Sequence, residues 1–164
     1  MTSWFQVSLA AAAGELFRSP AWFLGVLVMA FIKLFPPEGH DALPVKEVIR
    51  RLRDEFSTVD ADPDAGQDHV AGMMAATLRF SDKLPGKQER LTWLQSIQND
   101  AVYVSFGDDS GSVASCCVQP ASELFFDSPD AIDGPARPLL ERAAKALGYT
   151  VFDPEAEGRR RTNG

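Results

Sequence analysis

The sequence predicts an α+β fold: a single domain with a mixed or mainly antiparallel β-sheet and about four helices packed largely on one face. Three observations lead to this prediction. Residues 101–119 have the pattern of a central β-hairpin, residues 44–56 and 136–147 have the pattern of amphipathic helices, and strand-like runs alternate with helical ones. The helices need a sheet of this kind to bury their apolar faces.

The composition is typical of a soluble globular protein. The chain has 164 residues, 45% of them hydrophobic and 24% charged, which is enough for one domain with a buried core. Its formal net charge of −7 repels phosphate backbones, so we expect no nucleic-acid partner. Cys116 and Cys117 are adjacent and cannot build a disulfide framework, which favours the reducing cytoplasm.

The hairpin follows from the alternation of side chains along a strand. Val102, Val104 and Phe106 fall on one side of an extended chain, and Tyr103 and Ser105 fall on the other. Two glycines and two aspartates come next, and these residues tolerate the positive φ of a tight turn. We therefore expect one apolar face that serves as a floor for the helices.

The first 28 residues are treated as a doubtful N-terminal extension. Residues 21–32 are all apolar, but a membrane-spanning helix needs roughly 20 residues, and the chain lacks the basic start of a signal peptide. Met29 could therefore be the natural start, or residues 1–28 could form a short apolar helix. An anchor made by residues 20–35 is the alternative, and it would make the protein membrane-associated.

Residues 29–154 are predicted to form the domain, which opens with a strand from Met29. An amphipathic helix then covers residues 44–56, with these apolar residues at helical spacing: Val45, Val48, Ile49, Leu52 and Phe56. Residues 57–62 form a strand that Pro63 ends. Polar residues 155–164 are expected to be a disordered tail.

The middle of the chain predicts two more helices. Gly66 is expected to break the chain, and Asp68 to cap a helix that runs to about Phe80. Met73 and Met74 could line a ligand groove, but their spacing is typical of a core face. The third helix covers residues 87–98 and buries these residues: Leu91, Leu94 and Ile97.

The last third of the chain predicts a strand at 123–127, a helix at 136–147 ended by Gly148, and a closing strand at 149–153. Residues 143–154 resemble the helix–glycine–strand unit that closes many small bacterial proteins, toxin-neutralising ones among them. The resemblance covers about a dozen residues and is too unspecific to assign a family. It implies a binding role.

Alternate acidic residues lead to one metal hypothesis, at Asp60, Asp62, Asp64 and Asp68. Carboxylates at this spacing are typical of a calcium loop. However, Ala65 stands where the loop requires glycine, and Ala71 where it requires a bidentate glutamate. We therefore predict an acidic solvated loop and no metal site, and we expect no cofactor.

An enzyme is the first alternative function. His40 follows the first strand, and loops there often carry catalytic residues, so His40 with Glu38 or Asp41 could serve a small hydrolase or transferase. No nucleophile motif or phosphate-binding glycine loop accompanies it. Cys116 and Cys117 point to opposite faces of a strand, so one should be buried in the core.

The predicted function is a non-enzymatic binding or regulatory module that contacts a basic protein partner through an acidic surface. The candidate partner-binding residues are Asp60, Asp62, Asp64, Asp108 and Asp109. Trp93 and Tyr103 could anchor a partner if they are exposed. A membrane-tethered protein held by residues 20–35 is the remaining alternative.

Overall fold

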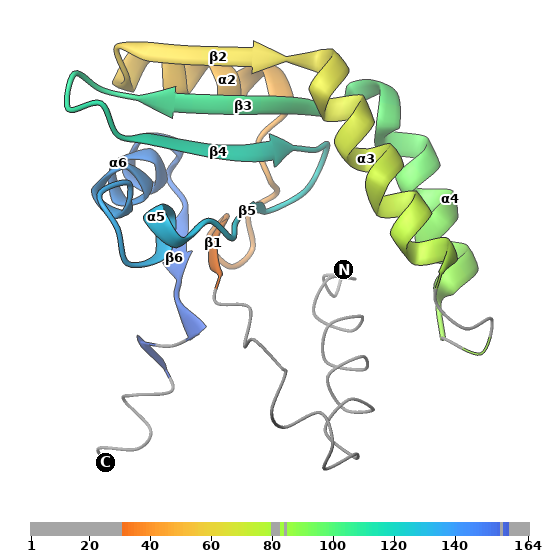
Figure 1. The fold of residues 1–164 in the computed structure, drawn as a ribbon. Helices are drawn as coiled ribbons and strands as arrows, with labels where there is room; N and C mark the ends of the chain where they lie inside the picture. The colour runs from red at the N-terminus through yellow and green to blue at the C-terminus, as the bar shows by residue number, and fades with distance from the viewer. Residues whose placement is uncertain (1–30, 80–82, 84, 155, 158–164) are drawn as a thin grey trace.

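The structure is a computed structural model, and it describes residues 31–79, 83, 85–154 and 156–157 (Figure 1). The doubtful extension, residues 1–28, lies outside the described residues, and so does most of the predicted tail. The two described tail residues, Ala156 and Glu157, are helical, and the Asp153 side chain accepts a hydrogen bond from the Ala156 N–H over 3.1 Å.

The described chain contains both helices and strands, with β-strands in separate runs between the helices, and the α+β fold class is confirmed. The strands are β1 (Ile32–Phe35), β2 (Thr58–Asp62), β3 (Val102–Gly107), β4 (Val113–Val118), β5 (Leu124–Phe126) and β6 (Thr150–Phe152). The helices are α2 (Val45–Glu55), α3 (Pro63–Leu78), α4 (Lys87–Ile97), α5 (Pro129–Ile132) and α6 (Arg137–Leu147), with a 3-10 turn, η2 (Gln98–Asp100), after α4.

The strands form two antiparallel sheets of three strands each, in the orders β2-β3-β4 and β5-β1-β6. The predicted hairpin is β3 and β4, with Val104 opposite Cys116 and Phe106 opposite Ala114. Because β4 and β5 lie next to each other, the inner faces of the two sheets line one main core.

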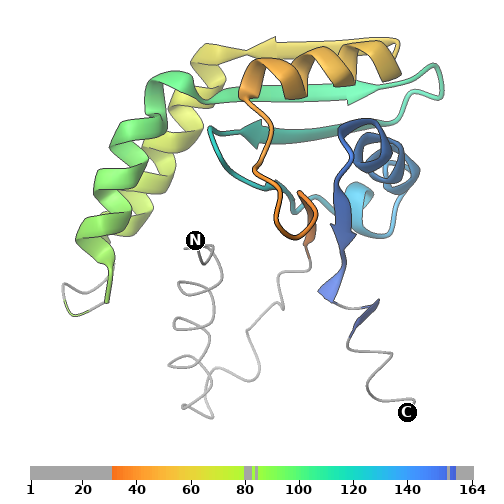
Figure 2. The same ribbon diagram turned by 180° about the vertical axis from the view of Figure 1, so that it is seen from behind.

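The main core lies between these inner faces and the helices α2, α5 and α6. Val48 and Leu52 are buried on α2, as their spacing predicted, and Leu140 is fully buried on α6. Figure 2 shows α2 lying along β2 and β3. Val104 and Phe106 of β3 complete the apolar floor that the hairpin was expected to supply.

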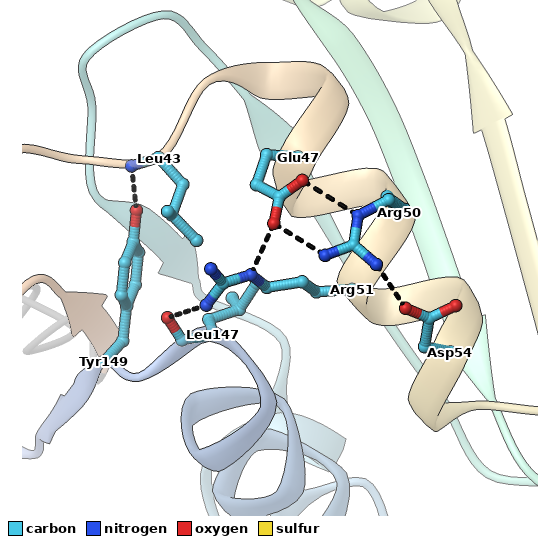
Figure 3. Close-up of polar contacts among 7 residues, drawn as sticks. All are labelled: Leu43, Glu47, Arg50, Arg51, Asp54, Leu147 and Tyr149. Atoms are coloured by element: carbon cyan, nitrogen blue, oxygen red, sulfur yellow. Dashed lines mark hydrogen bonds and ion pairs between the residues drawn. The ribbon is translucent and has the colours of Figure 1, made fainter.

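Polar contacts join α2 to the C-terminal segment (Figure 3). The Arg51 side chain donates to the backbone carbonyl of Leu147, at the end of α6, over 3.2 Å and to the Glu47 carboxylate over 2.7 Å. The Tyr149 hydroxyl accepts a hydrogen bond of 2.7 Å from the Leu43 N–H. These contacts hold the two ends of the domain against each other.

Helix α3 begins earlier than predicted. Gly66 does not break the chain and Asp68 is not the cap, because the helix begins at Pro63 and Asp62 accepts a hydrogen bond from its first turn. Proline suits the first position of a helix, since its φ is preset and the missing N–H would have had no helical partner. The residue predicted to end β2 therefore also starts α3.

Gly66 has a packing role inside α3. A Cβ at this position would lie 2.6 Å from the Cα of Val102, so only glycine lets the helix lie this close to β3. Helix α3 thus crosses the end of the β2-β3-β4 sheet on the face opposite α2, and α4 packs beside it (Figure 1). The two helices share a small second core: Val70, Leu94, Ile97 and Ala101.

Among the residues that the structure describes, no helix has both the length and the apolar character needed to cross a membrane. The alternative anchor, residues 20–35, ends inside β1, where Ile32 and Leu34 are fully buried. Residues 20–30 of that range lie outside the described residues.

Candidate binding groove

The predicted enzyme residues lie in an exposed loop after β1. Glu38, His40 and Asp41 are all exposed, and none of them lines the groove described below. The His40 Nδ1 atom is 3.3 Å from the backbone carbonyl oxygen of Glu38, so the ring contacts the main chain and not a carboxylate. A hydrolase or transferase centred on His40 stays a hypothesis.

The first group of predicted partner-binding residues shares one edge of the molecule. Asp60 and Asp62 lie on β2, the edge strand of its sheet, opposite Ser105 and Tyr103 of β3. Asp64 follows in the first turn of α3. All three aspartates are exposed. They do not form the predicted loop, but they stand close together along a strand and the helix that follows it.

The second group lies at the other end of β3. Asp108 is half-buried, and hydrogen bonds from Ser110, followed by the ion pair with Arg142 at 2.6 Å, hold its pKa below the ordinary value. Asp109 accepts a 3.3 Å hydrogen bond from the Ser57 hydroxyl. The structure therefore does not join Asp108 and Asp109 to the first group, and Asp108 is engaged within the fold.

A groove of about 460 Å³ opens on the face of β3 and β4 that is turned away from α2. Helix α3 supplies one side of it, and β1, β5 and β6 supply the other. Figure 1 shows α3 leaving the end of the sheet toward the same side as β1 and β5. Most of its large side chains are apolar or aromatic: Phe31, Met73, Tyr103, Phe125 and Phe152.

The aromatic rings come together because strand alternation turns them outward. Ile32 and Leu34 of β1 face the main core, so Phe31 and Lys33 face the groove. The rings of Phe31 and Phe125 stack with centroids 4.8 Å apart. Such rings offer a broad apolar surface to an incoming group.

One ion pair lies in the apolar lining. Lys33 is only 8% exposed, and its Nζ is 3.1 Å from a carboxylate oxygen of Glu123. The same Nζ lies 5.5 Å from the centre of the Phe152 ring. The lysine charge is thus compensated within the groove, as a buried charge must be.

The cysteines occupy opposite faces of β4, as predicted. Cys116 is buried in the main core, while Cys117 is half-buried against the second core, and both are among the residues that line the groove. Burial raises the pKa of both thiols above the ordinary value. Because the thiolate is the reactive form, this environment does not favour Cys117 as a nucleophile.

Gln119 is a buried polar residue of the groove, and its side-chain amide uses only part of its hydrogen-bonding capacity. The side chain is 6% exposed, and its Nε2 atom lies 3.7 Å from the Met73 sulfur. Among the buried side-chain oxygen and nitrogen atoms of the described residues, the Gln119 Oε1 has no hydrogen-bond partner. A buried acceptor without a donor is rare in folded proteins.

The arrangement suits noncovalent binding of an apolar group. In the described ranges, no three His, Cys, Asp or Glu side chains gather in a way that could hold a metal ion. Tyr103, considered as a partner anchor, is half-buried and lines the groove, while Trp93 is half-buried against the second core. Met73 both packs on that core and lines the groove.

Sequence reasoning did not single out Phe31, Phe125, Phe152 or Gln119. Three of them stand in or beside short strands, where an apolar residue is expected whichever face it occupies. The one available signal was the alternation around them, which marks these rings as opposite to the core-facing residues.

Comparison of the chain with protein-family models, curated proteins and solved structures returned no match.

Proposed function

We propose that the chain is a non-enzymatic binding module that holds a segment of a partner protein in this groove. The observation that carries the proposal is the cluster of aromatic side chains around a concave opening on a sheet face. Ligand sites are typically concave and mostly apolar, with a few polar groups that fix orientation. The groove has this character, whereas Glu38, His40 and Asp41 are exposed and do not line it.

Charge supports a basic partner. Asp127 is exposed and lines the groove, and Asp60 and Asp62 stand on the same sheet face, on the neighbouring strand β2. Lys33 adds no free positive charge, because Glu123 neutralises it. A segment with an apolar anchor flanked by Lys or Arg could therefore place its anchor in the aromatic groove and its basic residues near Asp127, Asp60 and Asp62.

The cytoplasm is the location that accompanies this proposal. Cys116 and Cys117 are both free thiols, and such thiols persist in reducing compartments. Separation of cells that express the full chain into soluble and membrane fractions tests this location. Recovery in the membrane fraction would favour an anchor before Ile32 instead.

The binding proposal is tested by selecting ligands from a random peptide library displayed on phage, with the full chain as the target at low salt. We expect enriched peptides to carry a large apolar residue next to Lys or Arg. Their binding should be lost in Phe125→Ala, which removes one face of the ring stack, and weakened in the double variant Asp60→Asn, Asp62→Asn.

Leu78→Ala is the matched control, because Leu78 is a large apolar residue, 60% exposed, that does not line the groove. Circular dichroism of each variant verifies the fold. Enriched peptides that bind Phe125→Ala as tightly as the wild type, or that carry no basic residue, would contradict the proposal.

A further inference from the structure

We propose that the open edge of β2 receives an extended segment of a partner protein as an additional strand, with Lys or Arg at alternate positions of that segment. The inference goes beyond the groove, because it concerns the backbone of a sheet edge and not an apolar cavity. When a strand is added to a sheet edge, main-chain hydrogen bonds supply affinity and alternate side chains supply specificity.

Among the described strands, β2 offers the longest open edge. It has five residues and pairs with β3 on one side. The strand at the other side of this sheet, β4, has β5 beside it. The outer strands of the second sheet, β5 and β6, have three residues each. The edge of β2 is therefore the place where an added strand would gain the most main-chain pairing.

The backbone of β2 has hydrogen-bonding groups to offer. In an antiparallel pair, successive residues of a strand direct their N–H and C=O groups alternately toward the partner strand and away from it. Strand β3 therefore pairs with one alternate set of β2 groups. Within the described residues, the backbone of residues 58–61 makes no hydrogen bond other than those of the ladder with β3. The outward set is open to an incoming strand.

The side chains of β2 form two rows of different chemistry. Asp60 and Asp62 are exposed and share a face with Tyr103 of β3, which lines the groove on the side turned away from α2. Val59 and Ala61 point the other way, are half-buried and pack against the main core. An added strand would continue both rows.

Charge complementarity identifies the occupant. Side chains directly opposite each other on neighbouring strands have Cβ atoms about 5 Å apart, so cations at alternate positions would lie beside Asp60 and Asp62. The residues between them would extend the row of Val59 and Ala61 and should be apolar. Asp108 differs from these aspartates, because Arg142 already neutralises it within the fold. The expected segment therefore alternates basic and apolar residues.

The test uses an end-blocked peptide, Lys-Val-Lys-Val-Lys, titrated into the full chain labelled with ¹⁵N. Two further peptides carry N-methyl groups, one on its lysine amides and the other on its valine amides. All three have the same side chains and charge, but an added strand turns only one of the two amide sets toward β2. We expect one methylated peptide to bind like the parent and the other roughly tenfold more weakly. The parent should also slow deuterium exchange of amides within residues 58–61.

Variants of the chain test the charge pairs. The double variant Asp60→Asn, Asp62→Asn should weaken the parent peptide roughly two- to thirtyfold, which is the range of two cross-strand pairs. Asparagine caps a helix as well as aspartate does, so α3 should remain intact. The matched control is Asp130→Asn, Asp133→Asn, which removes the same charge at exposed positions of α5 and the residue after it. This control should bind like the wild type.

Equal binding of the two methylated peptides, or equal weakening in the two double variants, would show that charge alone holds the peptide and would overturn the proposal. Shifts confined to groove residues, with residues 58–61 unchanged, would overturn it while the groove proposal stands. A chain that dimerises through β2 without peptide, as measured by sedimentation, would identify a second copy as the occupant instead.

Discussion

At the scale of single residues, Glu47 is the carboxylate whose surroundings change its chemistry most clearly. It accepts hydrogen bonds from the side chains of Arg50 and Arg51, which follow it by three and four positions on α2 (Figure 3). The bonds from Arg50 and then from Arg51 lower the pKa of Glu47 from 4.5 to about 2. The charged form of Glu47 is therefore favoured in the folded state.

A pH dependence of stability follows from this lowered pKa. A carboxylate with a depressed folded-state pKa stabilises the fold above its unfolded pKa, and this contribution is lost as the pH falls through the folded value. For Glu47 the loss covers the interval from pH 4.5 down to about 2. We expect Glu47→Gln to lower the melting temperature at neutral pH and to flatten its decline over that interval.

The measurement is thermal unfolding of wild type and Glu47→Gln as a function of pH. Glu89→Gln, at an exposed position of α4, serves as the control and should follow the wild-type curve. A Glu47→Gln curve parallel to the wild-type curve across the acid interval would show that these hydrogen bonds do not contribute to stability.

At the scale of elements, the sequence predicts well where apolar spacing alone decides the outcome. Helix α2, helix α6 and the β3–β4 hairpin each turn toward the main core the residues that their periodicity indicated, although Val45, Ile49 and Val102 are only partly buried. Gly148 ends α6 in the left-handed conformation, with φ 70°, as a glycine after a helix predicts. These features depend on residues close together in the chain.

The prediction was wrong where a residue acts through a distant contact. Gly66 was interpreted as a chain breaker, yet it lets α3 touch β3. Pro63 ends β2 as predicted, but it also starts α3. The sequence around Gly66 carries no sign of its neighbour Val102, 36 positions later. The short helix α5 was not predicted either, because Ser128 and Pro129 are equally common in loops.

Two glycines of α3 provide a direct test of this packing. At Gly66 an added Cβ would meet the backbone of β3, whereas at Gly72 nothing lies within 4 Å. We expect Gly66→Ala to lower the free energy of unfolding by about 2 kcal/mol, as overpacking does. Gly72→Ala should raise it by up to about 1 kcal/mol, because alanine is the better helix former. Urea denaturation of both variants measures the two changes.

The pair is informative because both substitutions raise helix propensity in the same helix. If Gly66→Ala were also stabilising, α3 would not lie against Val102 as described. If both were destabilising, the segment would not be helical at Gly72.

At the scale of the whole molecule, the domain has two apolar cores of unequal size. The main core joins both sheets with α2, α5 and α6, and the second joins α3, α4 and the residue before β3. The last five residues of α3, Met74 to Leu78, extend beyond Val70, and three of them are exposed, although Thr77 is buried. Fewer buried contacts imply easier local opening.

Hydrogen exchange should reveal this difference. We expect amides in the last five residues of α3 to exchange with deuterium before those of α2 and α6, which lie on the main core. Mass spectrometry of peptic fragments from the full chain makes the comparison in one experiment. Equal protection of α3 and α2 would mean that the two cores open together as a single unit.

The candidate groove shows why a site is harder to predict than a fold. Its rings come from the residue before β1 and from β3, β5 and β6, which are neighbours only because the two sheets lie beside each other. The alternation along each strand indicates which side chains point away from the core. The order of the strands decides which of them meet, and that order depends on long-range pairing.

The aspartates of β2 also affect how two copies of this chain interact. In the described part of the chain, β2 has a neighbouring strand on one side only, and an edge of this kind is where sheets of separate molecules join into aggregates. Asp60 and Asp62 place two negative charges along five residues of that edge. Identical molecules approaching edge to edge would bring like charges together, whereas an oppositely charged segment would meet no such barrier.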